Sequence, residues 1–195
     1  MTALIPEAPG LILIRHAMSE VRPGVASRLW GITAAAREDC VLLAHALPEG
    51  LSPAVWCSDE PKARQTAEVI ALRRGLSVEV DARFGEVDRP TIWDDDYRAL
   101  AARYLATGAG EGWEPRDHVV ERFSVAIAEA RAAHATGTLV VVNHGLALSL
   151  YLSSVTAIDL VPFWRALSFP DAWRFEPETG ELTRVFAAGL APPDA

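Results

Sequence analysis

The sequence predicts an α/β fold, a three-layer sandwich around a mostly parallel central sheet, and three observations support this class. Short runs of apolar and β-branched residues alternate with longer helical patterns along the chain. Two of the runs are apolar throughout, as expected of central strands that are covered on both faces. Half of the 195 residues are hydrophobic and no repeat or low-complexity linker divides them, which favours a single domain over residues 1–195.

The individual elements follow from local patterns. Thr33 is expected to cap the first helix, and another helix has Pro61 at its start and Gly75 at its end. Apolar runs predict strands over residues 10–16, 54–58, 77–80 and 138–144. Helical patterns occupy residues 33–47, 61–75, 94–108 and 115–137. The C-terminal segments are expected to form a hairpin joined through PETG, over residues 171–177 and 181–187.

Both wholly apolar strands end in a histidine. The run LILI is followed by Arg15 and His16, and the run LVVV is followed by Asn143 and His144. Burying an unpaired guanidinium is costly, so these side chains are expected to open into a polar pocket. Since ligands bind at the carboxyl ends of the strands in open parallel sheets, the two histidines are predicted to meet there.

A third segment adds an anion-binding feature. CSDEPKARQTAE follows the strand at 54–58 and opens the helix at 61–75. A helix N-terminus behind a strand has unpaired N–H groups and the positive end of the helix dipole, both of which favour anions. Lys62 lies in the first turn of this helix. We therefore expect a local anion site at the same edge of the sheet.

The overall charge limits the partners. The chain has 18 basic and 26 acidic residues and a formal charge of −8, so no broad attraction to nucleic acid or to an anionic membrane is expected. An anionic ligand must be drawn by a local cluster instead. Lys62 is the only lysine of the chain, and every other basic residue counted in that total is arginine.

The remaining composition indicates a compartment. No apolar run approaches the ~18 residues that span a bilayer, and the first residues lack the pattern of a signal peptide, so a cytoplasmic protein is expected. Cys40 and Cys57 have no metal-type spacing and are expected to be buried thiols. Capping of a helix explains Asp94, Asp95 and Asp96. We therefore expect no metal and no cofactor.

Three blocks of the sequence, in order, are similar to those of one family. LIRHAMSE resembles the RHG signature of the histidine phosphatase superfamily, which includes phosphoglycerate mutases and acid phosphatases. CSDEPKARQTAEVI resembles its S-x-x-x-R-A-x-Q-T-A-E segment, and VVVNHG resembles its later V-V-S-H-G. The resemblance implies the α/β sandwich of that family and phosphoryl transfer through a phosphohistidine.

The resemblance also implies roles for the matching residues. His16 would be the nucleophile, because a neutral ring nitrogen attacks phosphorus without a separate base. Arg15 would hold two phosphate oxygens with its planar guanidinium, and Lys62 would bind the phosphate from the helix. His144 would bind a further oxygen and stabilise the charge that develops during transfer.

The proton donor of this family is usually a Glu or Asp after the third strand. FGEVDRP resembles the family's L-x-E at that place, which makes Glu86 the expected general acid and, later, the base that activates water. Asp88 lies two residues further on and is the alternative.

Several positions depart from the family pattern. Lys62 stands where the family carries its second phosphate-binding arginine, and Arg64 is rotated from it by roughly 200° on the helix and cannot replace it. A lysine is one compact charge, so weaker binding of the phosphate is expected. Met18 and Arg22 stand where mutases of the family carry Glu and Asn, which disfavours a mutase. Arg22 is kept as a candidate substrate-binding residue.

The sequence thus favours a metal-independent phosphomonoesterase that works through a phosphohistidine on His16. Its partner would be a phosphorylated small molecule or a phosphoprotein. Lys62 and the altered motifs leave a non-catalytic protein that binds a phosphorylated ligand as the alternative, and a phosphoglycerate mutase-type phosphotransferase as a weaker one. The sequence leaves the substrate and the oligomeric state open.

Overall fold

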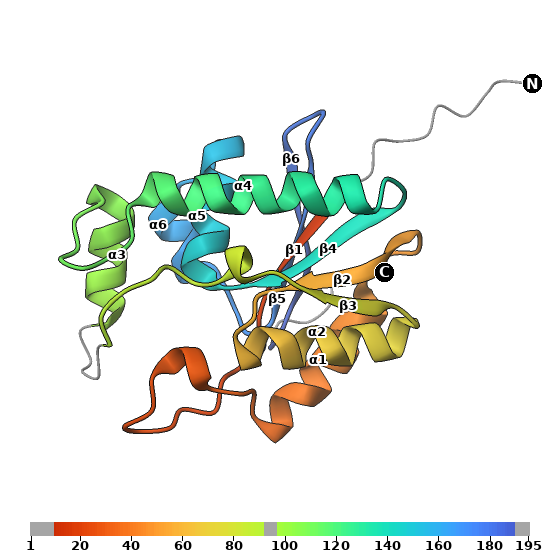
Figure 1. Cartoon of the computed structure of the whole chain (residues 1–195), viewed down its shortest axis with the longest axis horizontal. Helices are drawn as coiled ribbons and strands as arrows, with labels where there is room; N and C mark the ends of the chain where they lie inside the picture. The colour runs from red at the N-terminus through yellow and green to blue at the C-terminus, as the bar shows by residue number, and fades with distance from the viewer. Residues whose placement is uncertain (1–9, 92–96, 190–195) are drawn as a thin grey trace, which may run out of the picture.

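The computed structural model of the chain describes residues 10–91 and 97–189, and its centre is a sheet of six strands (Figure 1). The strand order is β3-β2-β4-β1-β5-β6. The first four of these strands are parallel to one another, and β5 and β6 complete the sheet as antiparallel neighbours. The strands are β1 (Leu11–Arg15), β2 (Leu51–Cys57), β3 (Ser77–Val80), β4 (Thr138–Asn143), β5 (Asp171–Glu176) and β6 (Glu181–Ala187).

Helices cover both faces of the sheet. Figure 1 shows α1 and α2 on one face and α4, α5 and α6 on the other. Two short 3-10 helices, η1 (Ser27–Leu29) and η2 (Ala82–Phe84), lie in the connections. The α-helices are α1 (Ala34–Ala46), α2 (Pro61–Arg74), α3 (Tyr97–Thr107), α4 (Arg116–Ala133), α5 (Gly145–Val155) and α6 (Leu160–Ala166). The α/β sandwich with a mostly parallel sheet is therefore confirmed.

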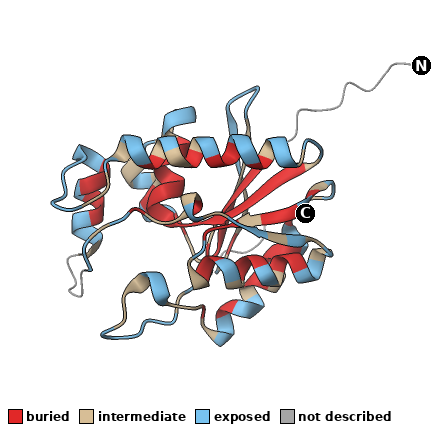
Figure 2. Cartoon of the chain, viewed as in Figure 1, coloured by how far each residue is buried: buried red, intermediate tan, exposed pale blue. Residues whose placement is uncertain are grey.

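The alternating side chains of β1 divide the core into two layers. Leu11 and Leu13 are fully buried among the residues of α3 to α6, while Ile12 and Ile14 are fully buried against α1 and α2. Each such side chain stabilises the fold by about 1.5–3 kcal/mol relative to an exposed one. Figure 2 shows the same burial along the central strands. A strand buried on both faces can open to solvent only at its ends, and the carboxyl end of β1 carries the polar residues.

Two helices have no counterpart in the sequence expectations. The first eight residues of α5 are all buried, so its sequence shows no polar face and no helical periodicity (Figure 2). The seven residues of α6 are too few to establish a pattern. The ends of other elements also shift, since β2 begins at Leu51 and α4 ends at Ala133. Asp94, Asp95 and Asp96 lie outside the described residues.

Local predictions hold at several positions. The Thr33 hydroxyl accepts a hydrogen bond from the Ala36 N–H and caps α1. Gly75 ends α2 with a positive φ, and Pro61 occupies the first turn. Cys40 and Cys57 are free, buried thiols. Within the described ranges, no helix has the length and apolar character that crossing a bilayer requires.

Candidate active site

The strand register places the two strand-end histidines side by side. Arg15 of β1 is opposite Asn143 of the parallel strand β4, and the His16 N–H donates to the Asn143 carbonyl at 2.9 Å. The next residue on each strand is therefore a histidine, and the His16 and His144 ring centroids lie 5.1 Å apart. The structure thus brings together the two residues that end the wholly apolar strands.

The surroundings of His16 fix which ring nitrogen carries the proton. Its Nδ1 lies 2.7 Å from the Ala17 carbonyl oxygen, and a carbonyl can only accept, so Nδ1 is the N–H donor. Nε2 therefore holds the free lone pair. Burial, followed by the charges of His144 and Lys62, lowers the pKa of His16 well below its ordinary value. A neutral ring with a free nitrogen is the form in which histidine acts as a nucleophile.

His144 is the residue just before α5 and is fully buried. Neither of its ring nitrogens makes a hydrogen bond within the described part of the chain, and Nε2 lies 3.4 Å from the Glu60 Oε1 atom. Burial, with a smaller contribution from the Lys62 charge, lowers the pKa of His144 well below its ordinary value. A buried polar ring without a partner requires an explanation, and a bound ligand would supply the missing hydrogen bond.

Arg15 is held by contacts that leave its charge unpaired. Its Nη1 donates to the Leu167 carbonyl at 3.0 Å, and its Cζ lies 3.4 Å above the centre of the Phe169 ring. Burial lowers the pKa of Arg15 to about 10, so it stays protonated at neutral pH. In the described ranges it makes no ion pair, and its Nε makes no hydrogen bond. A side chain at Gly145 would approach this Nε to 3.0 Å, so the glycine lets the guanidinium lie against the start of α5.

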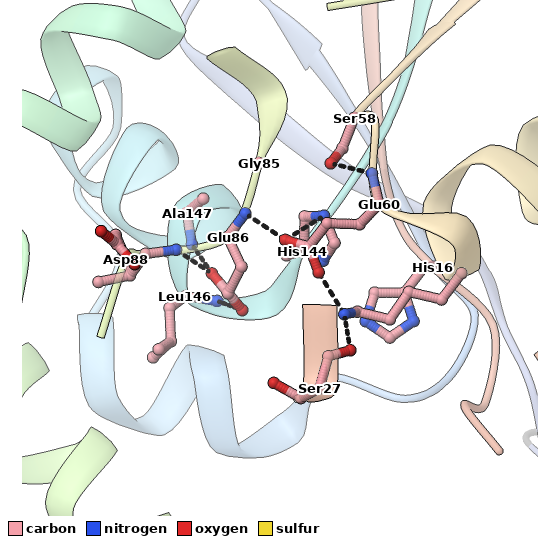
Figure 3. A network of polar contacts seen from close by, with 12 residues as sticks. His16, Ser27, Ser58, Glu60, Gly85, Glu86, Asp88, His144, Leu146 and Ala147 are labelled. Carbon is pink, nitrogen blue, oxygen red and sulfur yellow. Dashed lines mark hydrogen bonds and ion pairs between the residues drawn. The ribbon is translucent and has the colours of Figure 1, made fainter. Parts of the chain in front are cut away.

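Lys62, in the first turn of α2, is paired. Only 6% of the residue is exposed. Its Nζ donates to the Ser27 carbonyl at 2.8 Å and forms a short ion pair with Glu60 Oε2. Figure 3 shows this network, in which the Glu60 carboxylate lies beside the His144 ring. The second cation of the site is thus already neutralised by a carboxylate.

Glu60 connects the parts of this network and was missed by the sequence analysis. Besides binding Lys62, its Oε1 accepts a hydrogen bond from the Glu86 N–H at 3.1 Å. The residue precedes Pro61 at the start of α2, and none of its side-chain atoms caps that helix. An acid two positions before the only lysine was visible in the sequence. Nothing in the sequence indicates that its side chain turns toward the histidines.

Glu86 is anchored at the start of α5. Its Oε1 accepts hydrogen bonds from the Val87 and Ala147 N–H groups, both at 3.0 Å, and its Oε2 accepts from the Leu146 N–H at 3.2 Å (Figure 3). A carboxylate at a helix N-terminus satisfies otherwise unpaired N–H groups. The contacts hold the Glu86 carboxylate in a fixed position near the histidines.

Arg122 of α4 supports the segment that carries Glu86, and sequence reasoning missed it as well. Its guanidinium donates to the carbonyls of Arg83, Gly85 and Glu86 at 2.6, 3.0 and 3.1 Å. It also pairs with Glu114 at 2.7 Å. One guanidinium that binds three backbone carbonyls within four residues restrains this turn. Arginine on an apparently amphipathic helix gives no sign of such a role in the sequence.

The polar groups open into a pocket of about 550 Å³. Its floor contains Arg15, His16, Glu60, Lys62 and Glu86. The exposed Asp88 is also at the pocket, so both predicted general acids are present. The outer wall consists of larger and partly apolar side chains, among them Met18, Val21, Arg28, Trp30, Arg89, Tyr97 and Phe169.

Arg22 does not line this pocket. It is exposed, and its carbonyl accepts a hydrogen bond from the Val25 N–H in a turn. His144 also lies outside the lining, since it is buried behind His16. No group of three side chains suited to a metal ion occurs in residues 10–91 and 97–189.

Comparisons with known proteins match a segment of the chain that contains these site residues. The profile described as "Histidine phosphatase superfamily (branch 1)" matches residues 11–173. No curated protein matches the chain. Among solved structures, a mycobacterial glucosyl-3-phosphoglycerate phosphatase is similar, with 20% identity and a TM-score of 0.69, over 90% of this chain and 96% of that one.

Two further structures have the same fold. A putative alpha-ribazole-5'-P phosphatase from Escherichia coli is 18% identical, with a TM-score of 0.68, over 95% of this chain and all of that one. The Bacillus stearothermophilus protein YhfR is also 18% identical, with a TM-score of 0.70, over 94% of this chain and 98% of that one. At these identities the similarity establishes the fold.

Proposed function

Because the chain belongs to the histidine phosphatase superfamily, we propose that it is a phosphomonoesterase that works through a phosphohistidine on His16. The observation that carries the proposal is the state of His16. Its Nδ1 proton is held by the Ala17 carbonyl, which leaves the Nε2 lone pair free in a pocket whose lining includes the cationic side chains of Arg15 and Lys62. Solved structures of the same fold include phosphatases of two phosphorylated small molecules.

In the proposed reaction, the His16 Nε2 attacks the phosphorus of a phosphate monoester. The bond from phosphorus to the leaving oxygen breaks, and Glu86 gives that oxygen a proton. Glu86 then removes a proton from a water molecule, whose oxygen attacks the phosphohistidine and releases inorganic phosphate. Glu86 must therefore be protonated when the monoester binds, and the proton that it takes from water restores this form at the end of the cycle; Asp88 at the pocket is the alternative donor.

The remaining polar groups stabilise the transferred phosphoryl group. Within the described residues the Arg15 guanidinium makes no ion pair and its Nε–H makes no hydrogen bond, so its N–H groups would bind two phosphate oxygens. The ring of His144 donates an N–H to a further oxygen, and the Lys62 ammonium contributes its remaining N–H. In this scheme the nucleophile and the stabilising charges all come from side chains, so the reaction proceeds without a metal ion.

Release of inorganic phosphate tests the proposal. Wild-type protein, His16→Ala and His45→Ala are incubated with p-nitrophenyl phosphate and a panel of phosphorylated small molecules and phosphopeptides, with EDTA present. His45 is exposed on α1 and serves as the matched control. We expect turnover in wild type and in His45→Ala, and a loss of roughly 10⁴-fold or more in His16→Ala. Turnover retained in His16→Ala would refute the mechanism, and loss of turnover with EDTA would refute metal independence.

One observation favours a second function. The Glu60–Lys62 ion pair neutralises part of the phosphate site, which suits a protein that binds a phosphorylated ligand without turning it over. Such a protein would show no phosphate release from any member of the panel, while still binding inorganic phosphate in a calorimeter. Movement of phosphate between positions of one substrate, without release, would instead identify a mutase.

A further inference from the structure

Four of the charged side chains that line the pocket cancel one another when Glu86 is ionised. Arg15 and Lys62 are positive, whereas Glu60 and Glu86 carry carboxylates. His16 and His144 add no charge at neutral pH because burial lowers both pKa values. A phosphate monoester carries nearly two negative charges at neutral pH. A doubly charged phosphate would therefore leave this buried site with a net negative charge.

Glu60 is the carboxylate that lies next to the proposed position of the phosphate and so contributes most to this net negative charge. Glu86 is directed at the first N–H groups of α5, whereas the Glu60 carboxylate lies beside the His144 ring (Figure 3). Its Oε2 atom contacts the Lys62 ammonium, and its Oε1 atom lies 3.4 Å from the His144 Nε2. These two groups are the ones that the proposed function assigns to phosphate oxygens. Any phosphate held by both must lie next to Glu60.

Contacts on two sides fix the Glu60 carboxylate. One oxygen binds the Lys62 ammonium, and the other accepts the Glu86 N–H at 3.1 Å. Its side chain is only 13% exposed, so moving it away would leave a buried cation and a buried N–H without a partner. A lysine ammonium has three N–H groups, of which one binds the Ser27 carbonyl and one binds Glu60. The third can bind phosphate without releasing the carboxylate.

A phosphate oxygen and a carboxylate oxygen that bind the same ammonium lie close together. Both cannot keep a full negative charge there unless a proton is shared between them. Two like charges at such a separation in a buried site disfavour each other, and one proton between them removes the repulsion and adds a hydrogen bond. The other groups that face Glu60 are Lys62 on α2, His144 before α5 and the Glu86 N–H, and none of them can supply that proton at neutral pH while keeping its own role.

We propose that Glu60 is a specificity-determining residue that makes the site bind a phosphate together with one proton, shared between a phosphate oxygen and the Glu60 carboxylate. The inference rests on the proposed function, since it places the phosphate between Lys62 and His144. The site then takes the singly charged form of a phosphate group in preference to the doubly charged form. A phosphate diester, whose non-bridging oxygens are too weakly basic to share the proton with a carboxylate at neutral pH, is excluded as a good ligand.

Calorimetric titration with inorganic phosphate tests this inference without turnover. Wild type and Glu60→Gln are compared at about pH 6 and about pH 8, in buffers of different ionisation enthalpy. The glutamine oxygen can still accept the Glu86 N–H. Glu68→Gln is the control, because Glu68 is a half-exposed acid on the same helix that pairs with Arg64 away from the pocket.

In wild type and in Glu68→Gln we expect the affinity for phosphate to fall by about fivefold or more from about pH 6 to about pH 8, with uptake of close to one proton per phosphate at the higher pH. In Glu60→Gln the affinity should stay constant or rise over the same range, and the proton uptake should disappear. The two histidines and Glu86 are common to all three proteins, so the comparison isolates Glu60. Equal pH dependence in wild type and Glu60→Gln would overturn the inference.

A second measurement uses wild type alone and so does not depend on folding of the variant. The phosphorus NMR shift of bound phosphate should correspond to the singly charged form at about pH 8, where free phosphate is mostly doubly charged. A shift typical of the doubly charged form would contradict the inference. Proton-linked binding without turnover would leave the inference standing and refute the proposed function. Turnover with the doubly charged form of phosphate bound would support the proposed function and refute the inference. Absence of phosphate binding would also refute the inference.

Discussion

The two cationic side chains of the site differ in how they are held. Arg15, at the end of β1, is positioned by the Leu167 carbonyl and the Phe169 ring, and within the described residues it makes no ion pair. Lys62, in the first turn of α2, is bound to Glu60 and to the Ser27 carbonyl. Lys62 is buried and Arg15 is partly buried near the same pair of histidines, yet only Arg15 keeps its full charge available to a ligand.

This difference separates attraction of the phosphate from stability of the fold, because each cation contributes mainly to one of the two. Arg15 provides attraction and costs stability, because a partly buried charge has no carboxylate partner within the described residues. The paired Lys62 contributes to stability and provides less attraction, because its partner stays in place when a ligand binds. Each of the following predictions tests one side of the comparison.

The largest effect is expected from loss of Arg15. Arg15→Ala should lower kcat/KM for p-nitrophenyl phosphate by about 10³-fold, because the main binding group for the phosphoryl oxygens is removed. Lys62→Ala should lower it by only about tenfold, since its charge is already largely offset by Glu60. Steady-state kinetics compares kcat/KM of the two variants with that of wild type, and circular dichroism checks that both variants are folded. Equal losses in the two variants would show that pairing with Glu60 has no functional consequence.

Stability should show the opposite order. Lys62→Met leaves the buried Glu60 carboxylate without its cation and should reduce the free energy of unfolding by about 3 kcal/mol. Most of that loss should be recovered in the double variant Glu60→Gln/Lys62→Met, and Arg15→Met should cost less than about 1 kcal/mol because no carboxylate loses a partner. Urea denaturation of the four proteins measures these values. A double variant no more stable than Lys62→Met would contradict the assigned pairing.

The two buried histidines should make stability depend on pH. Their pKa values are lowered in the folded protein, so below about pH 6.5 the unfolded chain binds protons that the folded protein does not. The free energy of unfolding should therefore fall by about 1.4 kcal/mol per pH unit for each histidine between about pH 6.5 and pH 5, and should not change from this cause above that range.

Denaturation at several pH values measures this slope. His144→Asn should halve it, whereas His45→Asn, a change at an exposed residue of α1, should leave it unchanged. Carboxylates do not obscure the result, since those with lowered pKa values, such as Glu114, lose stability only at more acidic pH. A flat profile down to about pH 5 would mean that the histidines are protonated in the folded state.

The smallest effect is expected at Arg122, a positioning residue. Arg122→Met frees the carbonyls of Arg83, Gly85 and Glu86 and should lower kcat by about tenfold with little change in KM, because the loop that aims Glu86 is loosened. The pH optimum should also become broader. Arg64→Met on the outer face of α2 is the control and should have no effect on kcat. A change in KM alone would place Arg122 in substrate binding.

The sequence predicted those parts of the site that depend on strand patterns. The histidines end two runs that are apolar throughout, and parallel register then places His16 next to His144. The position of Lys62 followed from the helix start after β2. Glu60 and Arg122 could not be predicted because their roles depend on which way a side chain turns, and that is decided by packing between distant segments.

The same reasoning explains the helices that the sequence did not reveal. A helix is recognised by the alternation of a buried and an exposed face, and the first eight residues of α5 are buried on every side. The residue that α5 positions, His144, was nevertheless predicted, because the strand before it gave the signal. Candidate site residues were thus easier to predict from the ends of the strands than from the helices that complete the fold.

The central claim, a phosphohistidine on His16, is tested most directly by trapping it. Wild type, His16→Ala and His45→Ala are mixed with substrate, quenched in alkali within the first turnovers and digested for mass spectrometry. We predict a phosphoryl group on the peptide that contains His16 in wild type and in His45→Ala, lost on acid treatment, and none in His16→Ala. Release of phosphate by wild type with no phosphoryl group on His16 at any time, or with the group on another residue, would contradict the account.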